Sequence, residues 1–190
     1  MSMKVEFFYD YVSVYSYLAN SQLSNLAGAE IVYRPMLLGA VLEATGNRPP
    51  GAVKAKGKYL QVDIKRWAER YSLTFKMNPV FPQNTLKALR LALVAQKKDV
   101  FDVLHQALFD AMWVHEKNLN DKQVLAEIAA KVALSLEDIE DVAIKDELKA
   151  NTNEACERGA FGAPTFFVGD QMFFGNDRFE FIEDALRKKR

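Results

Sequence analysis

The fold is decided near the N-terminus by the stretch Lys4-Val-Glu-Phe-Phe-Tyr-Asp-Tyr-Val-Ser13-Val-Tyr-Ser16-Tyr-Leu-Ala19. Its residues 5–9 are apolar or aromatic except for Glu6, which is typical of a short strand covered on both faces. After a turn, residues recur at helical spacing, and all but Gln22 are apolar or aromatic: Tyr15, Leu18, Ala19, Gln22, Leu23 and Leu26. Ser13 is therefore predicted at the N-terminus of a helix, where backbone N–H groups have no partner within the helix.

Ser13 allows two interpretations at that position. Serine is a common N-cap, because its hydroxyl oxygen accepts a hydrogen bond from the helix backbone. Alternatively, the free N–H groups, the positive end of the helix dipole and the hydroxyl together form a site for an anion, including a thiolate. The local sequence favours the plain N-cap, whereas the C-terminal part of the chain adds support for the anion site.

The composition indicates a globular protein with a sizeable core, since 49% of the 190 residues are apolar and 26% are charged. The formal net charge is zero, which gives no support for a nucleic-acid partner or an acidic substrate. No apolar segment reaches membrane-spanning length, and we expect no signal peptide before the first strand. We therefore expect no nucleic-acid partner and no membrane partner.

Cys156 is the only cysteine in the sequence, which excludes an internal disulfide and any Cys-x-x-Cys motif within this chain. This indicates a reducing compartment, and we expect the protein to be cytoplasmic. Any sulfur chemistry then has to use a thiol from another molecule. His105 and His115 have no metal-ligand partner nearby, so we expect both to be structural or exposed and expect no metal site.

The middle of the chain is predicted to be helical. A second strand is expected at residues 30–34, and Thr45-Gly-Asn-Arg-Pro-Pro-Gly51 is a turn-rich loop. Helices are then expected from Lys54 up to a break at 79–82, at 85–97, at 99–114, at 121–132 and beyond Ser135 towards Gly159.

The C-terminal part returns to strands. Residues 163–168 and 171–174 form two strands joined by a hairpin turn, and a final helix follows with Phe179, Ile182, Ala185 and Leu186 directed inward. We therefore predict an α/β domain made of residues 1–36 and 144–190, into which residues 37–143 are inserted as a helical domain.

This order of elements, with Pro164 just before the third strand, resembles the thioredoxin fold interrupted by a helical domain, the DsbA-like arrangement. Redox members of that fold carry Cys-x-x-Cys at the N-terminus of the first helix, opposite a cis-proline. The corresponding residues here are Ser13-Val14-Tyr15-Ser16, so hydroxyls replace both sulfurs. That substitution alone excludes a dithiol oxidoreductase.

A narrower resemblance is carried by six motifs: Phe8-Tyr-Asp-Tyr-Val-Ser13, Tyr15-Ser-Tyr-Leu18, Thr45-Gly-Asn-Arg-Pro-Pro50, Val62-Asp-Ile-Lys-Arg-Trp67, Gly159-Ala-Phe-Gly-Ala-Pro164-Thr and Phe174-Gly-Asn-Asp-Arg178. In this order they resemble the kappa-class glutathione transferases and their bacterial relatives, the 2-hydroxychromene-2-carboxylate isomerases. The fourth and sixth motifs look closer to the isomerases. One departure is Val14, since the family usually has proline after the serine; valine leaves the first helical turn less preorganised but removes no functional group.

The resemblance implies glutathione as the cofactor, with its sulfur against Ser13. In the family this serine is not a nucleophile but donates a hydrogen bond to the thiolate, and the motif offers no histidine or lysine that would activate Ser13 as a nucleophile. The resemblance also implies that Ala163, before a cis-proline, binds the cysteinyl backbone of glutathione. The alternative is that Pro164 simply begins a strand at a permitted position.

The segment before the last helix is implied to bind the other end of glutathione. Free amides at Asn176, Asp177 and Arg178 suit the γ-glutamyl carboxylate, and the Asp177 side chain suits its ammonium group. A simple role of Asp177 as a helix cap explains the same residue equally well.

Two further pairs of residues match family positions. Asn47 and Lys56 are implied to contact glutathione, the lysine by pairing with a carboxylate, although a turn asparagine and a solvated lysine are plain alternatives. Arg48 and Asn84 are implied to contact the co-substrate by their position in the isomerases.

The activity implied by the resemblance is a glutathione-dependent isomerisation of an aromatic-degradation intermediate, in which a thiolate adds reversibly to a conjugated carbonyl. The alternatives are a kappa-like transferase or peroxidase, which shares the thiolate site, and a thioredoxin-fold binding module without chemistry. Kappa relatives are dimers, so the resemblance also implies a homodimer.

Overall fold

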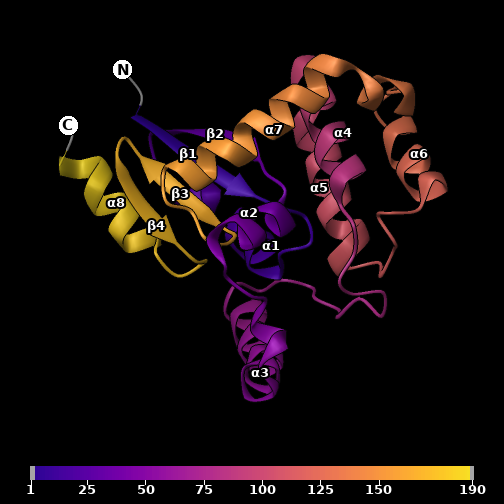
Figure 1. Cartoon of the computed structure of the whole chain (residues 1–190). Coiled ribbons are helices and arrows are strands. Elements are labelled where there is room, and N and C mark those ends of the chain that lie inside the picture. The colour runs from indigo at the N-terminus through magenta and orange to yellow at the C-terminus, as the bar shows by residue number, and fades with distance from the viewer. Residues whose placement is uncertain (1–2, 189–190) are drawn as a thin grey trace.

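Figure 1 shows the computed structural model of the protein, which describes residues 3–188. The strands are β1 (Met3–Tyr9), β2 (Ala29–Pro35), β3 (Thr165–Val168) and β4 (Gln171–Phe174). The α-helices are α1 (Val14–Asn20), α2 (Leu38–Thr45), α3 (Lys54–Arg70), α4 (Leu86–Lys97), α5 (Phe101–Trp113), α6 (Lys122–Ala130), α7 (Val142–Glu157) and α8 (Phe179–Lys188). Short 3-10 helices lie at η1 (Leu23–Asn25), η2 (Pro50–Ala52) and η3 (Leu136–Glu140).

The strands form one mixed sheet in the order β2-β1-β3-β4. β1 pairs in parallel with β2, so that Phe7 lies opposite Tyr33. On its other side β1 pairs antiparallel with β3, where Phe8 lies opposite Thr165, and β3 continues into the β4 hairpin. The N-terminal and C-terminal segments therefore join at the centre of the sheet, which agrees with the predicted α/β class interrupted by helices.

The two faces of the sheet bury different aromatic residues. Val5, Phe7 and Tyr9 of β1 lie in the larger hydrophobic core, together with residues of α1, α4, α5 and α8. Phe8 and Phe167 belong to a smaller core that also contains residues of α2 and α7. Because helices cover both faces, β1 needs apolar side chains at nearly every position, which is the pattern seen in its sequence.

Glu6 is the polar exception in β1, and Arg158 of α7 explains it. Its carboxylate accepts a hydrogen bond from Arg158 at 2.8 Å. The same guanidinium lies 3.8 Å from the centre of the Phe167 ring. Arg158 therefore neutralises the charge of Glu6 and also covers an aromatic ring on this face of the sheet.

The segment between β2 and β3 is helical, as predicted, and much of it shares the core of the sheet. Ala88 to Ala95 of α4 are buried with few gaps, as its apolar composition predicts. Leu104, Leu108 and Met112 of α5 are buried in the same core that contains β1. In Figure 1, α4, α5 and α6 form a group beside the sheet, linked back to it by α7. The domain division at residues 37 and 143 stays a prediction.

The first helix is shorter than its periodicity predicts. α1 ends at Asn20, and the hydroxyl of Ser21 donates to the backbone oxygen of Leu18 at 2.7 Å. A serine hydroxyl that donates to a backbone carbonyl of the helix in this way competes with the helical hydrogen bonds, which favours the end of the helix. Leu23 and Leu26 still reach the core, from η1 and the residue after it.

The length and inner face of α3 also differ from prediction. α3 begins at Lys54 as expected but ends at Arg70, well before the prolines at 79–82. Tyr59 and Val62, which mark the predicted apolar face, are 60% and 47% exposed, whereas Ile64 and Ala68 are buried.

The surroundings of α3 explain this difference. In Figure 1, α3 projects away from the sheet on the side of α1, so only a narrow strip of it is covered. Within residues 3–188 no helix is long and apolar enough to cross a membrane.

Candidate functional site

Ser13 lies at the N-terminus of α1 and joins it to the segment before β3. Its hydroxyl oxygen accepts a hydrogen bond from the backbone N–H of Ser16 at 3.1 Å, so Ser13 is an N-cap. The same hydroxyl donates to the backbone oxygen of Ala163 at 3.0 Å, across 150 positions of the sequence. The structure thus brings together the two segments that the sequence assigns to one site.

The Ala163–Pro164 segment is fixed on both sides. Its peptide bond is cis, as the sequence predicts. The backbone oxygen of Pro164 accepts a hydrogen bond from Gly175 N–H at 3.1 Å, and the Thr165 hydroxyl donates to the Gly162 oxygen at 2.8 Å. Among residues 3–188, the N–H of Ala163 has no acceptor, so it is free to pair with an extended peptide.

Asp10 holds the turn between β1 and Ser13. Its side chain is 1% exposed, and it accepts hydrogen bonds from Val12 N–H at 3.1 Å, Thr85 Oγ1 at 2.5 Å and Leu38 N–H at 2.9 Å. Burial raises the pKa of the Asp10 carboxyl, and these three donors oppose the rise. Asp10 therefore ties the Ser13 turn to the start of α2 and of α4, a role that sequence reasoning missed.

The Asn176 segment lies beside Pro164. Asn176 is 3% exposed, and its backbone oxygen accepts a hydrogen bond from the Tyr71 hydroxyl at 2.9 Å. Asp177 and Arg178 are exposed and form an ion pair at 2.6 Å. Gly175 has a φ of +106°, and a Cβ there would lie 2.9 Å from the Asp177 carboxylate, so this close turn requires glycine.

Asn47 and Lys56 lie on elements that flank this site. The Asn47 amide donates to the backbone oxygen of Phe161 at 2.7 Å, which anchors its loop to the segment leading to Ala163. Lys56 is exposed on α3 and lines a cavity of about 400 Å³ together with Tyr15 of α1. Both residues therefore lie next to the segments that carry Ser13 and Ala163.

Arg48 and Asn84 are less closely connected. Both are exposed, and the Asn84 side chain accepts a hydrogen bond from Leu86 N–H at 3.0 Å, a local contact at the start of α4. Arg48 donates its backbone N–H to the Asn47 side chain at 2.8 Å. In the described part of the chain, neither side chain forms a hydrogen bond with another candidate site residue.

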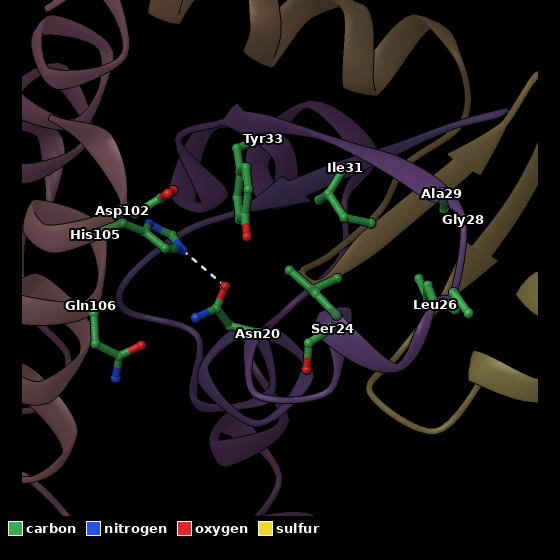
Figure 2. A pocket seen from close by; sticks show the side chains of 12 residues that line it. Asn20, Ser24, Leu26, Gly28, Ala29, Ile31, Tyr33, Asp102, His105 and Gln106 are labelled. Atoms are coloured by element: carbon green, nitrogen blue, oxygen red, sulfur yellow. Dashed lines mark hydrogen bonds between the residues drawn. The ribbon is translucent and has the colours of Figure 1, made fainter. Parts of the chain in front are cut away.

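A second cavity of about 480 Å³ lies at the other end of α1, between η1, β2 and α5 (Figure 2). His105 in its wall is 3% exposed, with Nε2 2.9 Å from Asn20 Oδ1 and Nδ1 2.8 Å from the Tyr11 hydroxyl. Burial lowers the pKa of His105 to about 3, so the ring is neutral and structural. Of the candidate site residues, none lines this cavity within residues 3–188.

The remaining chemistry-bearing residues are not gathered at a site. His115 is exposed, and Cys156 is partly buried in α7. Among residues 3–188, no group of three or more histidine, cysteine, aspartate or glutamate side chains is arranged to hold a metal ion.

Comparison with known proteins agrees with this geometry. Residues 4–187 match the family described as the DSBA-like thioredoxin domain. The chain belongs to this family. This DsbA-like thioredoxin chain is 32% identical to a 2-hydroxychromene-2-carboxylate isomerase of Sphingobium xenophagum over 98% of its length and 99% of the relative. It is 30% identical to glutathione S-transferase kappa 1 of Caenorhabditis elegans over 97% of its length and 91% of the relative.

A solved structure points the same way. The structure of a 2-hydroxychromene-2-carboxylate isomerase matches the DsbA-like chain with a TM-score of 0.84 and 30% identity, covering 98% of this chain and 96% of the other. The fold class and the family resemblance predicted from the sequence are thereby confirmed.

Proposed function

We propose that this protein is a glutathione-dependent isomerase that acts on an aromatic-degradation intermediate of the 2-hydroxychromene-2-carboxylate type. The observation that carries the proposal is the contact between the Ser13 hydroxyl and the Ala163 oxygen at 3.0 Å, beside the unpaired N–H of Ala163. It puts a hydroxyl donor next to a backbone group that can hold a cysteinyl residue. Full-length similarity to isomerases and kappa transferases supports an enzyme of this type.

The residues present fit glutathione. The N–H of Ala163 donates to the cysteinyl backbone, and the segment from Asn176 to Arg178 takes the γ-glutamyl group, with Asp177 against its ammonium. Lys56 pairs with a carboxylate of the tripeptide, and Asn47 holds the neighbouring loop. These roles rest on the resemblance and on the placement of the residues around Pro164.

The single hydroxyl proton of Ser13 has two possible acceptors, the Ala163 oxygen and the sulfur of a bound thiol. A hydroxyl donates one hydrogen bond at a time, so Ser13 turns from the Ala163 oxygen to the sulfur when a thiol is bound. Among the described residues, the backbone N–H groups of Val14 and Tyr15 also lack acceptors, and they add positive potential beside that sulfur. These donors favour the thiolate over the thiol, whose ordinary pKa is about 8.5.

When bound, glutathione would supply a thiolate nucleophile for reversible addition to the conjugated carbonyl of the acceptor, and it would be released unchanged. Ser13 holds the sulfur before addition and after release. Arg48 and Asn84 are the candidates for holding the co-substrate. The reducing compartment expected from the single cysteine suits a free thiol, and the cytoplasm and the homodimer stay predictions.

A kappa-like transferase is the second candidate, favoured by the similarity to the kappa 1 enzyme. The two activities share the thiolate and differ in what becomes of glutathione. An isomerase returns it unchanged, whereas a transferase keeps it in a thioether product.

The test combines a titration with a product analysis. The thiolate absorption band is recorded with glutathione near neutral pH, and glutathione is then quantified after turnover of 2-hydroxychromene-2-carboxylate. A thiolate band with full recovery of glutathione is expected; consumption of glutathione would indicate the transferase. A wild-type protein without a thiolate band would refute both and favour a binding module.

A further inference from the structure

Two tyrosines from different helices share one carboxylate next to the proposed thiolate site. The Tyr15 hydroxyl, in the first turn of α1, donates to Asp63 Oδ2 at 2.7 Å. The Tyr59 hydroxyl of α3 donates to Asp63 Oδ1 at 3.2 Å. The pKa of Tyr15 is raised mainly by burial and to a smaller extent by the hydrogen bond to Asp63, so its hydroxyl keeps its proton and acts as a donor.

The rings of these tyrosines form walls of a cavity. The cavity measures about 400 Å³, within the range that small-molecule sites occupy. Its other lining residues are Pro50, Ala55, Leu60 and Lys56. Apart from Lys56, which is proposed above to pair with glutathione, the lining is apolar and aromatic, and such a surface suits a flat conjugated compound.

The position of the cavity relative to the thiol follows from the chain. Tyr15 belongs to the same helical turn as the Ser13 cap. Lys56, proposed above to pair with a carboxylate of glutathione, also lines the cavity. The cavity and the proposed thiolate site therefore share the first turn of α1 and the Lys56 side chain.

The way in which α3 is attached to the protein makes Asp63 important for the geometry of this cavity. Only Ile64 and Ala68 of α3 are fully buried, and the helix projects from the body of the protein in Figure 1. Its polar connections to the site are the Tyr15–Asp63 hydrogen bond near its middle and the Tyr71–Asn176 hydrogen bond just after its end. Because little apolar burial holds α3 in place, the hydrogen bonds of Asp63 set the spacing between the two tyrosine rings.

We propose that the cavity between Tyr15 and Tyr59 binds the conjugated aromatic acceptor, and that Asp63 is the positioning residue that fixes its two aromatic walls. This inference rests on the proposed function, because the acceptor is defined there. Asp63 acts through the tyrosines and does not touch the reacting atoms.

The test measures acceptor binding without turnover. 2-Hydroxychromene-2-carboxylate is titrated by calorimetry into protein saturated with S-methylglutathione, which fills the thiol site but cannot react. Asp63→Asn keeps the size of the side chain and loses the charge that both hydroxyls share, so the dissociation constant should rise about fivefold to tenfold. Tyr59→Phe removes one exposed hydroxyl without threatening the fold and should raise it about threefold.

The controls separate this role from a general loss of structure. Tyr33→Phe on β2 makes the same chemical change at a distance, and Asp138→Asn removes an aspartate that pairs with Lys98. Both should bind the acceptor as the wild type does. The dissociation constant for glutathione and the thiolate titration should be unchanged in Asp63→Asn and Tyr59→Phe.

Each outcome decides something distinct. Equal acceptor affinity in the wild type, Asp63→Asn and Tyr59→Phe would overturn the proposal, as would a wild type that binds glutathione but not the chromene. Equal losses for the acceptor and for glutathione would also overturn it, since they would indicate a collapse of the site. A wild type that binds the chromene but forms no thiolate would refute the proposed function and leave the cavity assignment standing.

Discussion

Replacing Ser13 with alanine removes the N-cap, and it also removes one donated hydrogen bond, to the Ala163 oxygen in the free protein or to the sulfur when a thiol is bound. Loss of the N-cap to Ser16 costs about 1 kcal/mol of folding free energy, and the unpaired Ala163 oxygen costs about 1 kcal/mol more. For a chain of this length the melting temperature should fall by about 4–8 °C. Loss of a hydrogen bond to a charged group, about 1.5–3 kcal/mol, should raise the pKa of bound glutathione by about 1–2 units.

The thiolate fraction at neutral pH should then fall about tenfold to a hundredfold, and turnover should fall with it, while affinity changes little. The assay is a pH titration of the thiolate absorption band in wild type and Ser13→Ala. Ser16→Ala is the matched control, because the Ser16 hydroxyl in the same turn is buried without a partner among the described residues. An unchanged thiolate titration in Ser13→Ala would refute the role of this hydroxyl.

The remaining predictions concern Ser16, His105 and Gly175. Removing the unpaired hydroxyl in Ser16→Ala should raise the melting temperature by about 2–4 °C, roughly 1 kcal/mol; a lower value would contradict this. Burial lowers the pKa of His105 well below its ordinary value, so the stability that depends on its neutral form is complete above about pH 6.5 and is lost as pH falls. In denaturant unfolding, the free energy of unfolding of the wild type should fall by about 2 kcal/mol at pH 5, and that of His105→Gln should not show this loss. An equal fall in both proteins would contradict the prediction. Gly175→Ala and Gly159→Ala both place a side chain at positive φ, so each should lower the free energy of unfolding by about 1–2 kcal/mol in melting experiments. Only the Cβ of Gly175→Ala would press against the Asp177 carboxylate, so only this variant should bind glutathione more weakly, about fivefold by calorimetry. Equal glutathione binding by the two variants would argue against Asp177 as a ligand.

Much of the fold was predictable because its main elements carry their own periodicity. β1 is apolar on both faces, α4 is apolar nearly all round, and Gly169-Asp170 marks the hairpin, so their positions followed from local pattern. α3 was harder, because its apolar residues at Tyr59 and Val62 are 60% and 47% exposed. Tyr59 lines a cavity instead of a core, and no helical pattern distinguishes these two uses.

The candidate site was predictable in part for a similar reason. Ser13 and Ala163 each lie at a recognisable boundary, a helix start and a strand start, and they meet in the structure. The roles of Asp10 and Asp63 were missed because a single aspartate in a turn or a helix has no local pattern of its own. Their partners Thr85 and Tyr15 are distant in sequence, so only the folded chain shows the contact.

The central position of β1 has a consequence for how this protein is made. Phe8 pairs with Thr165, so the middle strand of the sheet waits for a neighbour that leaves the ribosome roughly 160 residues later, about 8–30 s at ordinary rates of synthesis. During that interval β1 presents an apolar edge with unpaired backbone groups, which is a template for pairing with other chains. The yield of active protein from cells should therefore depend on growth temperature and on chaperones that shield nascent strands, even for variants whose finished fold is no less stable.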